Sequence, residues 1–383
     1  MGSDAPGQEP GRGHGRELDR EPGRGHDREP GREHRAYIGS FTSVGGRGIT
    51  TAAVDPATGA LTPLSATDTV ADPSYLALSA DGSVLYAVSE ADPGAVRAFR
   101  PTGAGLAPLG GAAPVGGSGP THLAVAGRRL YTANYTSGSV SALALDAAGR
   151  PGGAVAVLPH RGSGPDPDRQ RQPHAHQVLP DPGGRWVLSV DLGTDSVRVC
   201  AADPASATDG SGGGLALRVH AEAKLPAGTG PRHLVFHPDG AVVYVLGELR
   251  PVLTVCRWDA AAGRLDPVAQ VPVVPAGAPA GVRAYPSAVV ADPDGRFVWA
   301  AVRGTDAIAV LSLADGPERP RLTATVPTGG RWPRDLALGP AGRLYAADER
   351  SGDVTWFDVD PRTGHPHRAG SVAVPAATCV VFG

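Results

Sequence analysis

The chain has 383 residues, of which 41% are hydrophobic and 19% charged, and its formal net charge is −3. This composition suits a globular protein with a large core, and the scattered lysines and arginines give no support to nucleic-acid binding or a membrane-surface role. No apolar run approaches membrane-spanning length and no signal-peptide core precedes the expected fold, so we expect a cytoplasmic protein.

Residues 1–35 form a low-complexity segment in which REPGRGHD is followed by REPGREHR. The segment has a single leucine and almost no other apolar side chain, so burial cannot offset the entropy lost on ordering. We therefore predict a disordered tail over 1–35 and a folded domain over 36–383.

The domain is expected to open with three strands, over 37–43, 48–54 and 60–66, with a turn at 55–59. A pattern of proline, apolar strand, turn and second strand then recurs, and a third strand follows each copy. The copies begin at Pro73, Pro120, Pro173, Pro231, Pro286 and Pro333. Repeats of roughly 50 residues with several strands each are typical of a β-propeller with one sheet per repeat.

The opening segment lacks the first strand of this pattern, and residues 375–382 resemble that missing strand. Six complete repeats and one shared between the two ends make seven. We therefore predict an all-β, seven-bladed β-propeller whose last blade is closed by the N- and C-terminal strands. Such closure removes the open sheet edges that promote aggregation.

The copy that begins at Pro231 predicts where a functional site lies. Arg232 and His233 precede its first strand, the hairpin signal Asp239-Gly240 follows that strand, and Glu248 comes after the second. In an antiparallel pair, the start of one strand and the end of the next lie at the same sheet edge. We expect the equivalent positions of all repeats to meet at one end of a central channel.

Two sets of residues occupy these positions. Those that directly follow the prolines are Ser74, Thr121, His174, Arg232, Ser287 and Arg334. Those that end the second strands are Glu90, Tyr135, Leu192, Glu248, Arg303 and Glu349, and Asp191 is among the residues just before them. From Pro173 onward the copies diverge into histidine, arginine and acidic residues, which indicates function rather than repeat structure.

His174 and His176 lie two residues apart, so an extended strand presents both on one side. A His-x-His pair lacks the further ligands that a zinc site needs, so we favour acid–base catalysis or hydrogen bonding to substrate over metal binding. Glu248 is the best candidate for a general base. The alternative for Glu248 is an ion pair with Arg232 or Arg250.

Arg232, Arg303 and Arg334 offer planar donors suited to a carboxylate, a phosphate or an oxyanion. The alternative is that they pair with acidic residues at the same rim, namely Asp191, Asp335 or Asp348. His233 is expected to have a partly structural role because its neighbour Leu234 must point inward. His122 is interpreted as an ordinary strand histidine.

The polar insertion at 161–173 leads directly into His174, and is either a substrate-contacting loop or a variable surface loop. The chain has no nucleophile elbow, P-loop or dinucleotide fingerprint, so we expect no cofactor. Addition of water or an internal carboxylate to a carbonyl or alkene needs only a base and a few cations.

The runs YIGSFTS, PSYLALSADGSVLYAVSE, PHAHQV, GPRHLVFHPDG and WPRDLAL resemble the lactonase family of seven-bladed propellers. That family includes bacterial 6-phosphogluconolactonases and fungal carboxy-cis,cis-muconate cyclases. The resemblance implies metal-independent opening or closure of a lactone ring. Its motif residues fall on His174, His176, Arg232, Glu248 and Arg303. The chain departs from the family's motifs at Gly247 and Val302, where asparagine is usual.

We therefore predict a metal-independent lactonase that acts on a sugar-acid lactone, most specifically 6-phospho-glucono-1,5-lactone, as a monomer or weak homo-oligomer. The expected catalytic residues are Glu248, His174, His176 and Arg232, and the expected substrate-binding residues are Arg303, Arg334, His233 and Asp191. The alternatives are a muconate-type cyclase, a propeller that serves only as a binding platform, and a calcium-dependent gluconolactonase-like propeller.

Overall fold

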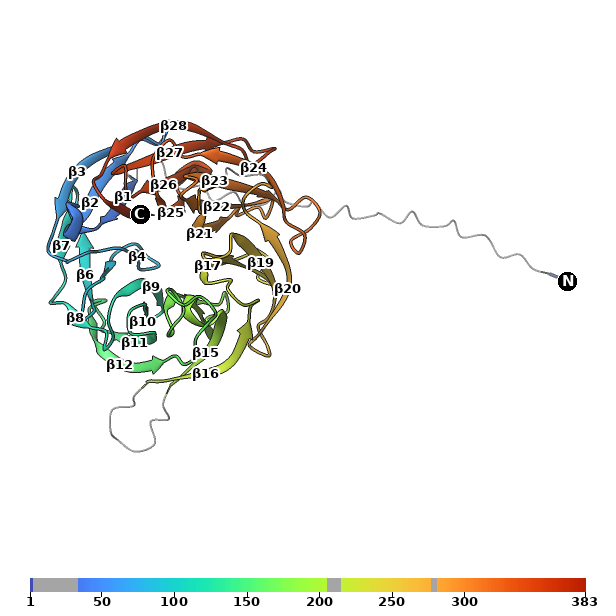
Figure 1. Ribbon diagram of the computed structural model, residues 1–383, viewed down its shortest axis with the longest axis horizontal. Helices are drawn as coiled ribbons and strands as arrows, with labels where there is room; N and C mark the ends of the chain where they lie inside the picture. Colours follow the sequence, from blue (N-terminus) through green and yellow to red (C-terminus); the bar gives the residue numbers. More distant parts are fainter. Residues whose placement is uncertain (3–33, 205–214, 277–280) are drawn as a thin grey trace. The chain divides into compact units, whose positions relative to one another are not determined.

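The computed structural model describes residues 1–2, 34–204, 215–276 and 281–383, apart from the side chains of 202–204 and 215–216. The domain from His34 to Gly383 consists of seven antiparallel sheets arranged around one axis (Figure 1). The predicted tail lies outside the described residues except at 1–2 and 34–35. Strand β1 already includes Arg35, one residue before the predicted boundary.

Each sheet forms one blade, and the blades are numbered here in chain order. Blade 1 contains β1 (Arg35–Ser40), β2 (Ile49–Val54), β3 (Leu61–Thr67) and β29 (Ala377–Phe382). Blade 2 contains β4 (Leu76–Leu78), β5 (Leu85–Ser89), β6 (Ala95–Pro101), β7 (Leu106–Pro108) and β8 (Ala113–Pro114). Blade 3 contains β9 (Pro120–Ala126), β10 (Arg129–Asn134), β11 (Ser139–Leu145) and β12 (Pro151–Pro159).

Blades 4 to 7 repeat the same order of four strands. Blade 4 contains β13 (Ala175–Pro180), β14 (Trp186–Asp191), β15 (Ser196–Pro204) and β16 (Leu215–Lys224). Blade 5 contains β17 (Pro231–Phe236), β18 (Val242–Gly247), β19 (Val252–Asp259) and β20 (Arg264–Pro272). Blade 6 contains β21 (Tyr285–Ala291), β22 (Phe297–Arg303), β23 (Ala307–Ser312) and β24 (Arg321–Pro327). Blade 7 contains β25 (Pro333–Leu338), β26 (Leu344–Asp348), β27 (Asp353–Val359) and β28 (Pro366–Ala373).

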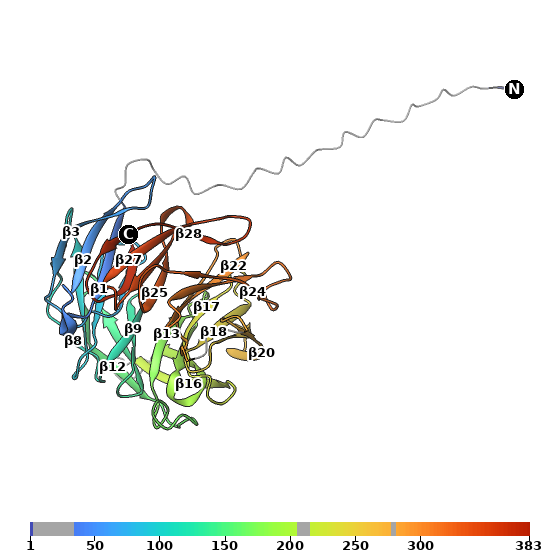
Figure 2. The same cartoon turned by 45° about the horizontal axis from the view of Figure 1, so that its top comes forward.

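The ring closes as the sequence predicted, because the C-terminal strand joins the first blade. β29 pairs antiparallel with β1, with Tyr37 opposite Val381 and Ile38 opposite Val380. The C-terminus accordingly lies beside the blade 1 strands in Figure 2. The all-β, seven-bladed fold with shared terminal strands is therefore confirmed.

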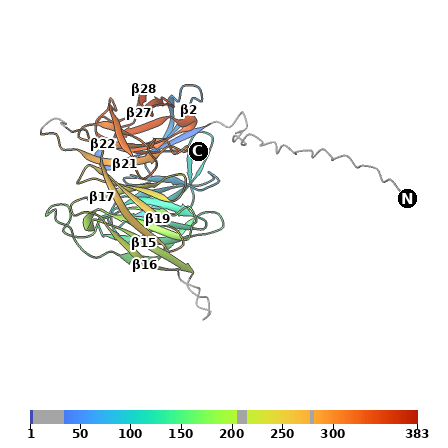
Figure 3. The same ribbon diagram turned by 90° about the vertical axis from the view of Figure 1, so that its right-hand side faces the viewer.

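The hydrophobic core lies between neighbouring blades, which face one another along the ring (Figure 3). Strand β18 shows why its sequence is apolar throughout. Val243 and Val245 pack toward blade 4, whereas Tyr244 and Leu246 pack toward blade 6. Successive strand residues point to opposite faces, and here both faces are buried, so the run does not alternate with polar residues.

The helical segments of the described residues are short 3₁₀ turns: η1 (Thr42–Val44), η2 (Leu192–Thr194) and η3 (Pro340–Gly342). In the part of the chain that the structure describes, no helix is long and apolar enough to cross a lipid bilayer.

Candidate functional site

A bulge near the start of the innermost strand directs one side chain out of the regular ladder in most of the blades. In β17, Pro231 pairs with Gly247 and His233 pairs with Leu246, so Arg232 has no partner residue across the ladder. A bulge of this kind re-aims the side chain of its extra residue. The residues at the same point in other blades are Thr121, His176, Arg334 and Thr378.

This register corrects the alignment of blade 4 that the prolines suggested. Ala175 pairs with Asp191 where blades 3, 5, 6 and 7 pair a proline, as Pro231 does with Gly247. His176, rather than His174, therefore occupies the position of Arg232. His174 lies one residue before β13, in the segment that enters the blade. The alignment is wrong by two residues because hydrogen-bonded register, not the proline, fixes equivalence between blades.

Glu248 is the centre of a cluster of guanidinium groups. Its Oε2 lies 2.8 Å from Arg303 Nη2 and 3.2 Å from Arg232 Nε. Its Oε1 lies 2.8 Å from Nη2 of Arg169, a residue of the 161–173 loop. The structure thus brings together Glu248, Arg232 and Arg303 from blades 5 and 6, as the sequence predicted, and adds Arg169, which the sequence analysis missed.

The electrostatics of this cluster fix the charge of the carboxylate. Burial raises the pKa of Glu248, but the charges of Arg303, Arg232 and Arg169 outweigh it and lower that pKa to about 2. Burial and the charges of Arg303 and Arg334 lower the pKa of Arg232 to about 9. Glu248 is therefore ionised at neutral pH and is a weak base, so it is better suited to holding the arginines than to accepting a proton.

Two of the arginines are also tied to the main chain. Arg232 Nη1 donates to the carbonyl oxygen of Ser287, and Arg303 Nε donates to that of Tyr285 at 3.1 Å. The Arg303 guanidinium lies 5.4 Å from the centre of the Trp332 ring. These contacts fix both guanidinium planes next to Glu248.

Arg334 lies with a second pair of carboxylates. Its Nη2 is 3.5 Å from Glu90 Oε2 and its Nη1 is 3.6 Å from Glu349 Oε2. Its guanidinium lies 4.8 Å from the centre of the Phe41 ring, and 15% of its side chain is exposed. Its acidic partners are therefore the residues that end the second strands of blades 2 and 7, and not the aspartates considered from the sequence.

Imidazole rings from three blades gather beside Arg232. The centre of the His233 ring lies 5.5 Å from that of His176 and 5.6 Å from that of His122, and the His122 ring lies tilted over Tyr75 with its centre 3.9 Å away. Burial, reinforced by the charge of Arg232, holds the pKa of His176 and His233 well below the ordinary range and lowers that of His122 to about 3. These imidazoles are neutral at neutral pH.

His122 is the second residue that the sequence analysis missed. Its apolar neighbours are typical of an ordinary strand histidine, yet it lies two residues after Pro120 just as His233 lies two residues after Pro231. The ladder confirms the equivalence, because both residues follow the bulge of their strand. This shared spacing is the signal that could have found it.

His174 is half-buried and its orientation is well defined. Its ring stacks on Tyr135 at 4.4 Å, and its Nδ1 lies 2.9 Å from the Tyr135 carbonyl oxygen. A carbonyl oxygen only accepts, so in the neutral imidazole the proton lies on Nδ1 and the lone pair on Nε2. His174 is therefore arranged as a proton acceptor.

Asp191 binds the main chain of His174. Its Oδ1 accepts from the His174 backbone N–H at 2.9 Å, and its Oδ2 lies 2.6 Å from His160 Nδ1 and 2.9 Å from Arg198 Nη1. Asp191 is fully buried among these partners. The Asp191 carboxylate thus contacts the main chain just before β13 and Arg198 on β15, the third strand of blade 4.

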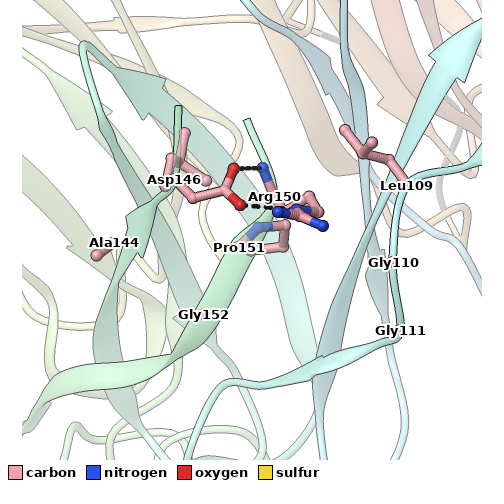
Figure 4. Close-up of a pocket in the computed structure, with 9 residues that line it drawn as sticks. Leu109, Gly110, Gly111, Ala144, Asp146, Arg150, Pro151 and Gly152 are labelled. Atoms are coloured by element: carbon pink, nitrogen blue, oxygen red, sulfur yellow. Dashed lines mark hydrogen bonds and ion pairs between the residues drawn. The ribbon is translucent and has the colours of Figure 1, made fainter. Parts of the chain in front are cut away.

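A separate groove of about 450 Å³ lies between blades 2 and 3 (Figure 4). It is lined largely by glycine and apolar residues, and its charged side chains, Asp146 and Arg150, pair with each other at 2.6 Å. None of the predicted site residues lines this groove. Among the described residues, no group of three or more histidine, cysteine, aspartate or glutamate side chains is arranged to hold a metal ion.

Comparison with known proteins identifies the class to which this fold and site belong. The family described as "Lactonase, 7-bladed beta-propeller" matches residues 35–382. The chain belongs to this family. It is 30% identical over 352 residues to the 6-phosphogluconolactonase of Bacillus subtilis, a match that covers 90% of this chain and 97% of that protein.

Solved structures show the same likeness. A crystal structure from Bacteroides fragilis superposes with a TM-score of 0.84 at 30% identity, covering 92% of this chain and 98% of that one. The periplasmic gluconolactonase PpgL of Pseudomonas aeruginosa superposes with a TM-score of 0.83 at 27% identity, covering 91% and 98%.

Proposed function

We propose that the protein hydrolyses the lactone of a sugar acid, most specifically 6-phospho-glucono-1,5-lactone to 6-phosphogluconate. Membership of the lactonase family and the similarity to a 6-phosphogluconolactonase and a gluconolactonase support this activity. The observation that carries the proposal is the set of fixed guanidinium groups around Glu248, with several imidazoles nearby. Ester hydrolysis needs a proton acceptor and cations that stabilise a developing oxyanion.

In the proposed mechanism, His174 Nε2 takes a proton from water as the water oxygen attacks the lactone carbonyl carbon. Arg232 and Arg303 stabilise the negative charge that develops on the carbonyl oxygen. The ring C–O bond then breaks, and the leaving ring oxygen takes the proton back from His174. Glu248 holds the arginines in place, and the low pKa of its carboxyl group is the reason that His174 is the favoured base.

The remaining predicted residues are given binding or positioning roles. His176 and His233 are neutral imidazoles, and each offers one donor and one acceptor, which suits sugar hydroxyl groups. His176 is the alternative base, although its lowered pKa makes it a weaker one. Arg334 is proposed to bind substrate at the partly exposed rim. Asp191 is proposed to position the main chain of His174.

The rate enhancements that these groups can supply are sufficient for lactone hydrolysis. A general base contributes about 10²- to 10⁴-fold to the rate and an oxyanion donor about 10²- to 10³-fold.

The expected cytoplasmic location and the absence of a cofactor stay predictions, and one of the similar structures is a periplasmic protein.

The test is a pH-stat assay of the full chain with gluconolactone and its 6-phosphate, with and without a chelator. We expect proton release faster than spontaneous hydrolysis, no effect of the chelator, and a loss of about 10²- to 10⁴-fold in His174→Gln. Failure to accelerate hydrolysis of either lactone would contradict the proposal. An undiminished rate in His174→Gln would remove that residue from the mechanism.

A further inference from the structure

Arg169 differs from the other two arginines of the Glu248 cluster in its exposure and in its contacts. Its side chain is 35% exposed, compared with 3% for Arg232 and 8% for Arg303. Its Nη2 meets Glu248 Oε1 at 2.8 Å and the Tyr135 hydroxyl at 3.3 Å, and both contacts are with side chains. Arg169 is therefore the guanidinium of this cluster that an entering solute can reach.

The main chain that carries Arg169 is fixed. Asp166 Oδ1 accepts from the Arg169 backbone N–H at 3.0 Å. On the other side, the Gln170 side-chain amide donates to the Leu192 carbonyl oxygen and to Asp195 Oδ1, each at 2.8 Å. The guanidinium can therefore turn toward a ligand while the loop stays in place, so little ordering entropy is lost on binding.

Charge in the cluster also favours this movement. Three guanidinium groups share the single carboxylate of Glu248, which leaves an excess of positive charge for an anion to neutralise. Arg169 is alone on Oε1, whereas Arg232 and Arg303 both contact Oε2. If Arg169 leaves, Glu248 keeps two cations, so no buried carboxylate is left without a partner.

We propose that Arg169 is a specificity-determining residue that selects lactones carrying a phosphate monoester. Its guanidinium turns from Glu248 Oε1 to the phosphate, which its planar fork can bind through two parallel hydrogen bonds. This inference rests on the proposed lactonase function and assigns to the 161–173 loop the recognition of the anionic end of the substrate.

The test compares Arg169→Gln with Arg171→Gln in the full chain. Arg171 is a matched control because it lies on the same loop, 77% exposed, with Asp168 as an ion-pair partner at 3.7 Å. The quantity measured is the ratio of kcat/KM for 6-phosphogluconolactone to that for gluconolactone. We expect this ratio to fall about 10- to 100-fold in Arg169→Gln, mainly through KM, and to stay unchanged in Arg171→Gln.

A binding measurement separates this inference from the proposed function. Titration calorimetry with 6-phosphogluconate and gluconate should show that Arg169→Gln weakens the binding of 6-phosphogluconate but not that of gluconate. Arg169→Lys should have an intermediate affinity for 6-phosphogluconate, because lysine keeps the positive charge but loses the planar fork of donors. Selective binding without any lactone turnover would overturn the proposed function and uphold the role of Arg169. If the preference for the phosphorylated substrate or ligand over the unphosphorylated one is the same in Arg169→Gln as in the wild type, the proposed role of Arg169 is wrong, whereas the proposed lactonase function is unaffected.

Discussion

Blades 4 and 7 place an aspartate at the same point of their second strand but surround it differently. Asp191 and Asp348 each pair with the residue that starts the innermost strand, and both are fully buried. Asp191 contacts Arg198, two residues beyond its partner on the third strand. Asp348 has Thr355 at that point, whose hydroxyl donates to it at 3.1 Å.

The pKa values of the two carboxyl groups shift in opposite directions. Burial raises the pKa of Asp191, but the hydrogen bond from His160 and the charges of His160 and Arg198 outweigh it, so the pKa is lowered. Burial, together with the charge of Asp353, raises the pKa of Asp348 to about 7 against the hydrogen bonds it receives. Asp191 thus has neighbouring cations that overcome the effect of burial on its pKa, whereas Asp348 has hydroxyl donors and other carboxylates, so the effect of burial prevails.

Blade 3 shows a third, uncharged version of the same position. Asn134 stands where the aspartates stand and donates through Nδ2 to Ser141 Oγ at 2.8 Å and to Ser139 Oγ at 3.1 Å. The site therefore accepts a neutral amide without a cation, and this provides a natural template for substitutions in the other two blades.

Removal of the cation in blade 4 should have the largest effect. We expect Arg198→Met to lower the free energy of unfolding by about 3–5 kcal/mol, because it leaves Asp191 buried without its arginine. Chemical denaturation at pH 8 would measure this loss. A loss below about 1 kcal/mol would show that His160 alone satisfies Asp191 and would break the comparison between the two blades.

Neutralisation of the carboxyl group in blade 7 should act in the opposite direction. Because the folded pKa of Asp348 lies near 7 and the unfolded value near 4, this group favours folding at acid pH and loses that contribution as the pH rises through this window. Asp348→Asn should therefore stabilise the protein at pH 8 by about 2–4 kcal/mol and flatten the pH profile of stability between pH 4 and 7.

The matched control for that variant is Asp191→Asn. Its lowered pKa means that Asp191 stabilises the fold above the unfolded pKa, so this variant should be less stable than the wild type at pH 8. Thermal unfolding of both variants across pH 4.5–8.5 would decide the matter. If both substitutions shift stability in the same direction, the assignment of charge to the two sites is wrong.

A smaller effect is expected on catalysis. Asp191→Asn keeps an acceptor for the His174 N–H but turns an amide N–H₂ group toward Arg198 and His160, so it should displace the segment that carries the proposed base and reduce kcat about tenfold, with KM little changed. Asp348→Asn should leave kcat unchanged. Equal kcat values in the folded Asp191→Asn variant and the wild type would show that the loop before β13 holds His174 without help.

The sequence predicted the part of the site that the repeat pattern controls. Arg232 and Glu248 flank one hairpin, and antiparallel pairing brings the flanks of a hairpin together whatever the rest of the chain does. Arg303 was predicted because it occupies in blade 6 the position that Glu248 occupies in blade 5. The pairing of these residues was therefore a consequence of local topology.

Other parts of the site depend on features that the repeat does not encode. The position of His176 depends on a bulge whose register the proline does not mark. Arg169 reaches Glu248 from a loop, and no periodicity shows which of that loop's arginines does so. A role for Asp191 in substrate binding stays a prediction, and the repeat pattern does not show that Arg198 on the neighbouring strand contacts its carboxylate.

The bulge in the innermost strands also has a consequence for how such a molecule can diversify. In β17 the side chains that build the core keep their alternation, whereas the extra residue stands outside that alternation. Packing and chemistry are thus assigned to different residues of one short strand. A histidine, an arginine and a threonine occupy this position in neighbouring blades of the same ring, which shows that a common scaffold tolerates very different reactive groups there.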